Sequence, residues 1–462
     1  MDYRKFKIYH FFLALLFFFT LALSKTSFAQ QSLTLQYLEP IQNNYTNPAF
    51  ITDYEWHIGM PCLSSLSFQY GNSGFKYTHL VVTREDDSTY LDLDNFIDVL
   101  KKKNNLSVEL QEELLSFGMK YDDYYITFSV SDKVSAYWNY PKDFFEFVVK
   151  GNGKFLGETA NFNDMALKVN HYREYALGAA RELNSQWTVG AKVKLLFGKM
   201  NISAKNIDAS IYTDPTTFDL EITTNVDINT SIPQSLTDSD VDFDLGNYFW
   251  NGKNPGLALD LGAIYKYNDE ITISGSLLDF GFIRWKSDVK NFKNENVTWT
   301  FEGIDVNDYI GENDSTVKAH LESFKDSIAD KFMIDESSDK YSEALTSKIY
   351  LGGTYTLSDD EIIGLLTRTF IFDGRLHPSI TASYNRKLHE MISATASYTV
   401  INRNFGNVGL GFVFNWKQLQ VYAATDNIFG LFMPDKSKYY NFHFGINFVF
   451  EESLTNAVPL IF

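Results

Sequence analysis

The feature that most constrains this 462-residue chain is a long-range alternation of apolar and polar residues. Near the C-terminus the odd and even positions separate cleanly: Asn441, His443, Gly445 and Asn447 occupy one row, and the other is Tyr440, Phe442, Phe444, Ile446, Phe448 and Phe450. The same period of two recurs in Trp187 to Gly198, Leu257 to Tyr267 and Val408 to Trp416. Because successive side chains of a strand point to opposite faces, the pattern predicts strands with one apolar and one polar face.

Short polar turns separate these segments, which indicates antiparallel hairpins. The turns expected are Ser131-Asp132-Lys133, Asn184-Ser185, Asn268-Asp269-Glu270, Ser358-Asp359-Asp360, Arg386-Lys387 and Trp416-Lys417-Gln418. The strands expected lie near 62–71, 75–83, 121–131, 134–140, 171–183, 186–200, 216–228, 256–268, 271–286, 347–357, 360–371, 376–400 (a pair), 405–416, 418–427 and 438–450. About fourteen strands are expected to form the sheet, with sixteen as the alternative, since bacterial single-chain barrels have even numbers.

Long acidic insertions alternate with the short turns. They are Glu85 to Asp98, Asp208 to Gly246 and Asn307 to Glu343, and a helix is predicted over Asn105 to Phe117, where it would form a lid or dock a partner. This asymmetry is typical of an outer-membrane β-barrel, whose turns on the periplasmic side are tight and whose outer loops are long. The fold predicted is therefore all-β: an antiparallel transmembrane β-barrel over 62–450, with a C-terminal tail at 451–462. A soluble exported β-protein would show the same alternation and stays the alternative.

The first 29 residues have the features of a secretory signal peptide. Arg4, Lys5 and Lys7 precede an apolar stretch from Ile8 to Leu23, and Ser27-Phe28-Ala29 fits a cleavage site. No apolar run of about 18 residues follows Leu23, so no membrane-spanning helix is predicted in the mature chain. The formal net charge of −18 excludes the basic surface that a nucleic-acid partner requires. The single cysteine, Cys62, excludes an intramolecular disulfide.

Motifs for chemistry are missing or incomplete. His389-Glu390-Met391-Ile392-Ser393 begins like a zinc helix but has Ser where the second His is required. Asp238, Asp240, Asp242 and Asp244 alternate before Gly246, without the glycine and terminal glutamate of a calcium loop, so a solvated acidic loop is favoured over a cation site. No enzyme activity, catalytic residue, metal site or cofactor is therefore expected.

Several short motifs resemble one group of barrels. They are Asn43-Asn44-Tyr45-Thr46-Asn47-Pro48-Ala49-Phe50, the segment Ser276 to Trp285, Thr425-Asp426-Asn427-Ile428 and the closing strand Asn441 to Phe450. Together they resemble a Bacteroidota outer-membrane barrel family of unknown function, similar to the fatty-acid-transporter type and to PorP/SprF-type barrels linked to type IX secretion. The resemblance implies fold and membrane rather than a substrate. It would place the N-terminal segment 30–61, with Asn47, Pro48 and Ala49, inside the lumen as a plug; a periplasmic turn before the first strand is the alternative.

Three charged residues are further lumen candidates. Asp260 lies in the polar row of its strand, and Asp279 and Arg284 flank Gly281. Asp279 and Arg284 are interpreted as a luminal ion pair at a strand kink, or else as solvent-facing loop charges.

The function expected is that of an outer-membrane channel or transporter for a hydrophobic or small solute. An apolar passage with a lateral break at Gly281 would favour it. A filled lumen would favour the alternative, a non-enzymatic membrane platform for periplasmic or type IX secretion-system partners. Outer-membrane lipid is an expected partner in either case.

Overall fold

The computed structural model describes residues 40–163, 165–236, 242, 244–302, 331, 332, 334–372, 375–401 and 404–451. The predicted signal peptide, residues 30–39, the tail beyond Glu451, Asp238 and Asp240 lie outside the described residues, as does most of the insertion from Asn307 to Glu343.

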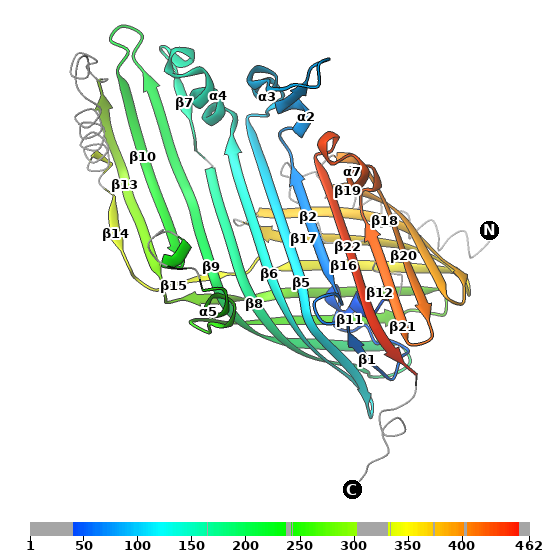
Figure 1. The fold of residues 1–462 in the computed structure, drawn as a ribbon. Helices are drawn as coiled ribbons and strands as arrows, with labels where there is room; N and C mark the ends of the chain where they lie inside the picture. The colour runs from blue at the N-terminus through cyan, green and yellow to red at the C-terminus, as the bar shows by residue number, and fades with distance from the viewer. Residues whose placement is uncertain are drawn as a thin grey trace.

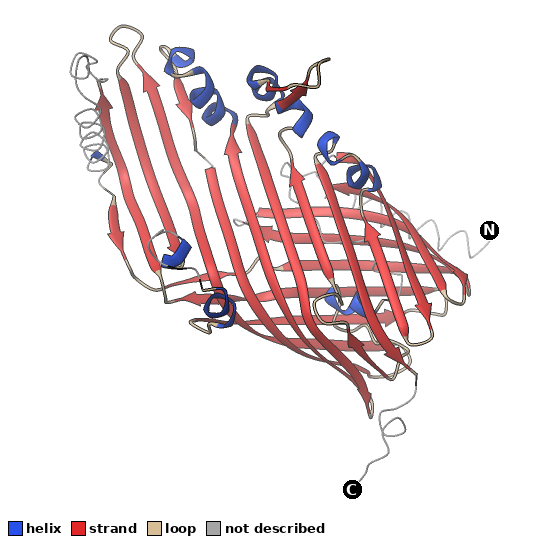
Figure 2. Ribbon diagram, in the orientation of Figure 1, coloured by secondary structure: helices blue, strands red, loops and turns tan. Residues whose placement is uncertain are grey.

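Strands dominate the described chain (Figures 1 and 2). Their bounds are β1 Trp56–Gly59, β2 Leu66–Asn72, β3 Val81–Thr83, β4 Thr89–Leu91, β5 Lys103–Tyr121, β6 Tyr124–Pro141, β7 Thr159–Asn161, β8 Met165–Glu182, β9 Trp187–Thr213, β10 Leu220–Ser231, β11 Asn254–Lys266, β12 Ile271–Trp285, β13 Val289–Phe301, β14 Asp335–Ser337, β15 Tyr341–Ala344, β16 Lys348–Ser358, β17 Glu361–Phe372, β18 Arg375–His389, β19 Ile392–Ile401, β20 Asn404–Trp416, β21 Leu419–Thr425 and β22 Tyr439–Phe450. The helices are η1 Ile41–Tyr45, α2 Tyr77–Leu80, α3 Leu93–Val99, α4 Lys142–Lys150, η2 Asn152–Phe155, η3 Gln234–Leu236, α5 Leu245–Trp250, α7 Ile428–Phe432 and η5 Pro434–Lys436.

All strands except β3 and β4 belong to one closed antiparallel transmembrane barrel. Some positions in its wall are built from successive segments: β1 with β2, β7 with β8, β10 with β11, β12 with β13, and β14 with β15 and β16. Counted in this way, the described ladders run through fourteen positions, which begin with β1 and β2, continue through β5, β6 and β8, and end with β22. The ring closes because β22 pairs with β1 and β2. The predicted fold is confirmed. The wall begins at Trp56, earlier than the predicted boundary at residue 62.

The burial pattern is inverted relative to a water-soluble protein. On β9, Val193 and Leu195 are 49% and 52% exposed, whereas Lys192 and Lys194 are each 4% exposed. On β22, Phe448 is 40% exposed and Asn447 is fully buried. Because the apolar row faces outward and the polar row faces the lumen, the outer wall suits lipid rather than water. This arrangement argues against the soluble alternative.

A charge placed on the outward row is expected to destabilise the barrel according to its depth. Phe444 lies midway along the outward row of β22, so Phe444→Arg should cost about 2–4 kcal/mol of folding free energy in a bilayer. Phe432→Arg, on the exposed rim helix α7, should cost about 0–1 kcal/mol. Urea unfolding in lipid vesicles measures both, and equal costs would contradict the assigned lipid face.

Two predicted elements are wrong. Asn105 to Phe117 is not a helix but part of β5, which pairs with β2 on one side and β6 on the other. The predicted strand near 75–83 contains helix α2, and only β3 is extended; it pairs with β4 in a separate two-stranded sheet. In the part of the chain that the structure describes, no helix has both the length and the apolar character needed to cross a bilayer.

The expected turn at Ser131-Asp132-Lys133 is also wrong, because β6 runs through it without a break. Asp132 lies opposite Arg173 of β8, whose guanidinium donates to both carboxylate oxygens at 2.8 and 2.6 Å. Helix α5 covers this pair: Arg173 packs over the Trp250 ring at 4.9 Å, and the Tyr248 hydroxyl lies 2.7 Å from His171 Nδ1. The helix therefore shields a charged pair on the outward row.

Helices α2, α3, α4 and α7 lie at the ends of the strands opposite the short turns (Figure 1). Phe96, Ile97, Leu100 and Tyr140 form a buried apolar cluster there, and Asp92 accepts a hydrogen bond from Asn95 N at the start of α3. On one side of this rim, β9, β10 and β13 continue beyond the rest of the barrel. The predicted insertion from Asp208 to Gly246 is thus partly strand.

Candidate lumen site

The N-terminal segment from Pro40 to Ala49 lies inside the barrel near the short turns. Its side chains bind the wall mainly through hydrogen bonds. Gln42 and Asn447 exchange two side-chain bonds at 2.9 and 3.0 Å, and Gln42 also donates to Ser64 O at 2.9 Å. On the opposite wall, Lys192 Nζ donates to Asn44 O at 2.8 Å and lies over the Tyr45 ring. The segment therefore spans the lumen from β22 to β9.

The Asn47-Pro48-Ala49 turn rests on a pair of glycines. Gly190 of β9 and Gly262 of β11 lie directly opposite each other in the ladder. A Cβ on Gly190 would overlap Pro48 O, and one on Gly262 would overlap Asn47 Oδ1. Only residues without side chains let the turn approach the wall this closely.

Asn47 fixes the turn through its amide. Its Oδ1 accepts from Ala49 N at 2.9 Å, and its Nδ2 donates to the carbonyls of Ala263 and Gly275 at 3.2 Å. Ser276 Oγ donates to Thr46 O. Asn47, Pro48 and Ala49 are all buried, so the structure places all three predicted plug residues in the lumen.

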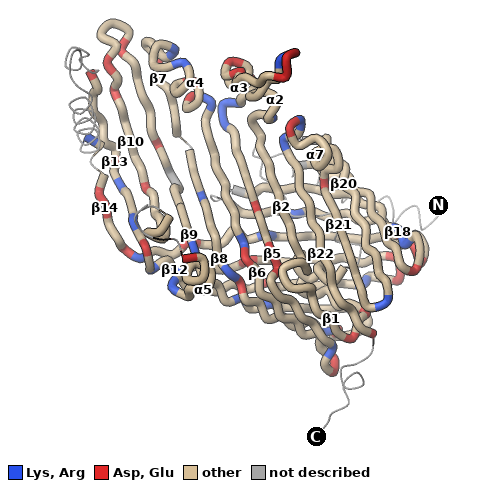
Figure 3. Tube along the Cα trace, in the orientation of Figure 1, with Lys and Arg blue, Asp and Glu red and all other residues tan. Residues whose placement is uncertain are grey.

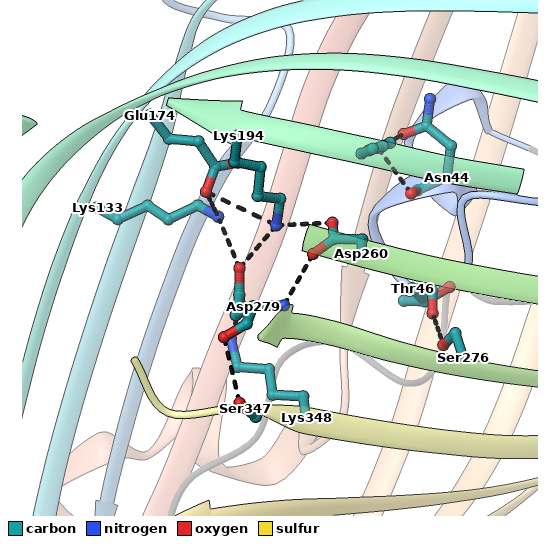
Figure 4. A network of polar contacts seen from close by, with 11 residues as sticks. Asn44, Thr46, Lys133, Glu174, Lys194, Asp260, Ser276, Asp279, Ser347 and Lys348 are labelled. Atoms are coloured by element: carbon teal, nitrogen blue, oxygen red, sulfur yellow. Dashed lines mark hydrogen bonds and ion pairs between the residues drawn. The ribbon is translucent and has the colours of Figure 1, made fainter. Parts of the chain in front are cut away.

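Many charged residues lie at the turns and the rim (Figure 3). A separate cluster of buried charges lies inside the barrel, farther from the short turns than the plug, and Figure 4 shows it from close by. Lys194 is at its centre: its Nζ lies 2.7 Å from both Asp260 Oδ2 and Asp279 Oδ1, and 3.7 Å from Glu174 Oε2. Lys133 Nζ lies 2.7 Å from the same Glu174 oxygen. Each carboxylate thus contacts at least one ammonium, which offsets the cost of burying these charges.

The cluster reaches across the barrel. Lys348 of β16 lies 3.6 Å from Asp279 Oδ2 and 3.9 Å from Glu109 Oε2 of β5. These two strands are six positions apart in the ring, so the contact joins opposite walls. Tyr137 adds a hydrogen bond to Glu109 Oε1 at 2.7 Å.

A β-bulge positions the two aspartates. The register between β11 and β12 shifts between Leu259 and Leu261, and Asp279 has a φ of 56°. Asp279 N donates to Asp260 Oδ1 at 2.8 Å, which satisfies the amide that the bulge leaves unpaired. Both lumen candidates are thus brought together.

The third charged candidate lies elsewhere. Arg284 is exposed between the buried Ile283 and Trp285, so its side chain is on the outward row, and Asp279 pairs with lysines instead. The predicted Asp279–Arg284 ion pair is wrong because the two residues are five positions apart along a strand, an odd number, which places them on opposite faces. Gly281 lies within β12, which continues through it without a break.

An apolar cluster fills the lumen between the charges and the rim. Its members are Tyr172, Leu196, Ala258, Ile283, Trp285, Val289 and Leu345. Beside the charges is a cavity of about 50 Å³, lined by residues that include Gln69, Glu109, Lys133, Asp279, Lys348 and Asn441. Plug, charge cluster and apolar cluster thus occupy the lumen one after another.

The sequence indicated only part of this site. Lys192 and Lys194 stood in the predicted polar row, and a lysine in the interior of a membrane barrel requires a partner. The partners of Lys194 come from β8, β11 and β12, and the partner of Lys192 comes from the plug. No local pattern reveals such neighbours. Lys133 was assigned to a turn, and Lys348 and Glu174 were not singled out.

Among the described residues, no group of three or more His, Cys, Asp or Glu side chains is arranged to hold a metal ion. Cys62 is exposed and not in a disulfide.

A protein-family model described as "Family of unknown function (DUF5723)" matches residues 48–426. The chain belongs to this family. The matched region includes the plug turn from Pro48, the charge cluster and nearly all barrel strands up to β21. A search of curated proteins gives no match.

Solved structures similar to the chain are bacterial barrels. The Pseudomonas putida toluene transporter TodX is 9% identical, with 88% of this chain and 93% of that chain covered and a TM-score of 0.39. A Pseudomonas aeruginosa FadL homologue is 11% identical, with 93% and 100% covered and a TM-score of 0.40. The KdgM porin is 6% identical, with 84% and 99% covered and a TM-score of 0.23.

Proposed function

We propose that this protein is a gated outer-membrane channel for a small solute and is closed in the conformation described here. The observation that carries the proposal is the N-terminal segment inside the lumen. It is attached to the wall by side-chain hydrogen bonds and is not a strand of the barrel. Such bonds each contribute only about 0.5–1.5 kcal/mol net, so the segment can detach while the ladders of the wall stay intact.

The lining of the lumen supports a route for solutes. From the rim, a solute would pass the apolar cluster around Trp285, then the charges around Lys194, and last the plug. Passage requires the plug and the cross-lumen Lys348–Glu109 contact to separate. Neither change breaks a backbone ladder. The continuous β12 offers no lateral break at Gly281, so the route we propose runs along the barrel axis.

A membrane platform is the second candidate. The filled lumen favours it, and so does the wall of β9, β10 and β13 that extends beyond the rest of the barrel (Figure 1). A platform needs a stable barrel and exposed surfaces, and it needs no open passage. Its partners would be envelope or secretion-linked proteins.

Loosening the plug separates the two functions. Asn447→Ala combined with Ser276→Ala removes three plug-to-wall hydrogen bonds, worth about 1.5–4.5 kcal/mol in total. We expect the double variant to raise the rate of liposome swelling with small sugars at least about tenfold. Asn385→Ala is the matched control, because Asn385 is a buried asparagine of β18 that bonds Ser383 and Ile362 O.

The opposite result of this experiment would favour the platform. A double variant that folds, swells no faster than the wild type, and co-purifies with a stable envelope partner would reject the channel in favour of the platform. Heat-modifiability on gels verifies that each variant has formed a closed barrel.

A further inference from the structure

The cavity in the lumen carries charges of both signs on facing walls. Lys133 and Lys348 line it together with Glu109 and Asp279. The rest of the lining includes the neutral polar Ser67, Ser135 and Asn441 and apolar groups such as Tyr172 and Leu345. A site for an apolar solute would have few charged and polar groups, because an apolar guest leaves them without partners. The lining therefore indicates a polar guest.

Gln69 is the clearest sign of a missing ligand. It lies on the inward row of β2, is 4% exposed and lines the cavity. Neither its Nε2 nor its Oε1 has a hydrogen-bond partner. A buried amide with both ends unpaired is costly, and it offers N–H donors at one end and an acceptor oxygen at the other to a guest.

The Lys348 ammonium and Glu109 Oε2 also lack close partners, although Glu109 Oε1 accepts from Tyr137. Their closest approach is 3.9 Å, and Lys348 is 3.6 Å from Asp279, so both contacts are longer than a hydrogen bond. By comparison, Lys194 makes two contacts of 2.7 Å in the same cluster. An ammonium and a carboxylate thus face the cavity with room for a guest to bind each of them closely.

The cavity volume limits the size of the guest. About 50 Å³ corresponds to roughly three to five water-sized groups. Glycine has five non-hydrogen atoms, one cationic end and one anionic end. A long acyl chain does not fit this volume.

We propose that the cavity binds a small zwitterion of the amino-acid type. The carboxylate of the guest binds Lys348 and Gln69 Nε2, and its ammonium binds Glu109 and Gln69 Oε1. The proposal rests on the proposed function, since a lumen site matters only where solutes pass. It adds a substrate class that the barrel fold does not specify.

The test uses the full-length protein in detergent and isothermal titration with four probes: glycine, acetate, methylammonium and toluene. We expect glycine to bind more tightly than each of the others. We expect Gln69→Leu and Lys348→Met each to weaken glycine binding about tenfold or more, because each removes a bond to a charged group. Lys168→Met is the matched control, since Lys168 is a partly buried lumen lysine that pairs with Glu343 at 2.9 Å and does not line the cavity.

Each outcome decides the proposal. Acetate or methylammonium binding as tightly as glycine would overturn it in favour of a site for one charge. Toluene binding in preference to glycine would also overturn it. No binding of any probe by a folded protein would mean that the cavity holds water only. In that case, swelling by the plug-loosened variant would still uphold the channel. Glycine binding without any swelling would support the zwitterion site and reject the channel.

Discussion

Replacement of Lys194 by Met should lower the free energy of unfolding by about 3–5 kcal/mol, the cost of breaking a buried ion pair from one side. Lys194 contacts Asp260, Asp279 and Glu174 within 3.7 Å, and its side chain is only 5% exposed. Without the ammonium of Lys194, Asp260 loses its ion-pair contact. The negative carboxylates then remain close together in a water-poor lumen. Urea unfolding in lipid vesicles, followed by the gel shift between folded and unfolded protein, measures the change.

Lys192→Met is the matched control for this experiment. Lys192 lies two residues earlier on the same inward row, is equally buried and donates to Asn44 of the plug. Its loss should destabilise the barrel less, because its partners are neutral oxygens. Adding Asp260→Asn to Lys194→Met should recover part of the stability. Equal losses for the two lysine variants, without recovery in the double variant, would contradict the central role of Lys194.

The glycine pair beneath the plug gives the second large effect. In Gly190→Ala the new Cβ would overlap the Pro48 backbone carbonyl, which cannot rotate away as a side chain can. We expect the Asn47-Pro48-Ala49 turn to leave the wall, with loss of the bonds from Asn47 and Ser276. Those three bonds are worth about 1.5–4.5 kcal/mol. Liposome swelling should approach that of a protein lacking residues 40–49.

Gly275→Ala is the control for the glycine variant. Its Cβ would meet Leu351 Cδ2 at 3.4 Å, an ordinary contact on the side of the strand away from the plug, and alanine keeps the backbone carbonyl that accepts from Asn47. Hydrogen exchange of residues 40–49 should therefore increase in Gly190→Ala and stay unchanged in Gly275→Ala. Unchanged exchange in both variants would show that the turn does not depend on the glycine pair.

The incorrect prediction of a helix over Asn105 to Phe117 has a simple origin in the spacing of its leucines. Leu106, Leu110 and Leu114 are four residues apart, a spacing that places side chains on one face of a helix and equally on one face of a strand. In β5 the outward row includes Leu106 and Leu110, and a bulge between Glu113 and Leu115 then shifts the outward row to Leu115 and Phe117. Pairing with β2 and β6 decides between the two forms.

The lumen site was predictable only in outline. The odd spacing along β12 is enough to place Asp279 and Arg284 on opposite faces of the strand, provided that the strand is known to continue through Gly281. The position of Lys348 beside Glu109, in contrast, cannot be read from any single strand. These residues are far apart in the sequence and on strands facing each other across the barrel, so only closure of the ring brings them within 3.9 Å.

The sequence by itself determined most of the strands and their apolar and polar rows, and it favoured the barrel class, because the period of two and the short turns are local properties of the chain. The Asn47-Pro48-Ala49 turn could also be recognised from its own short motif. Tertiary structure decided the strand order of fourteen positions, the bulges, the glycine pair that receives the plug and the partners of Lys194. These depend on which strands become neighbours and which face each other after closure, and strand alternation carries no information about that.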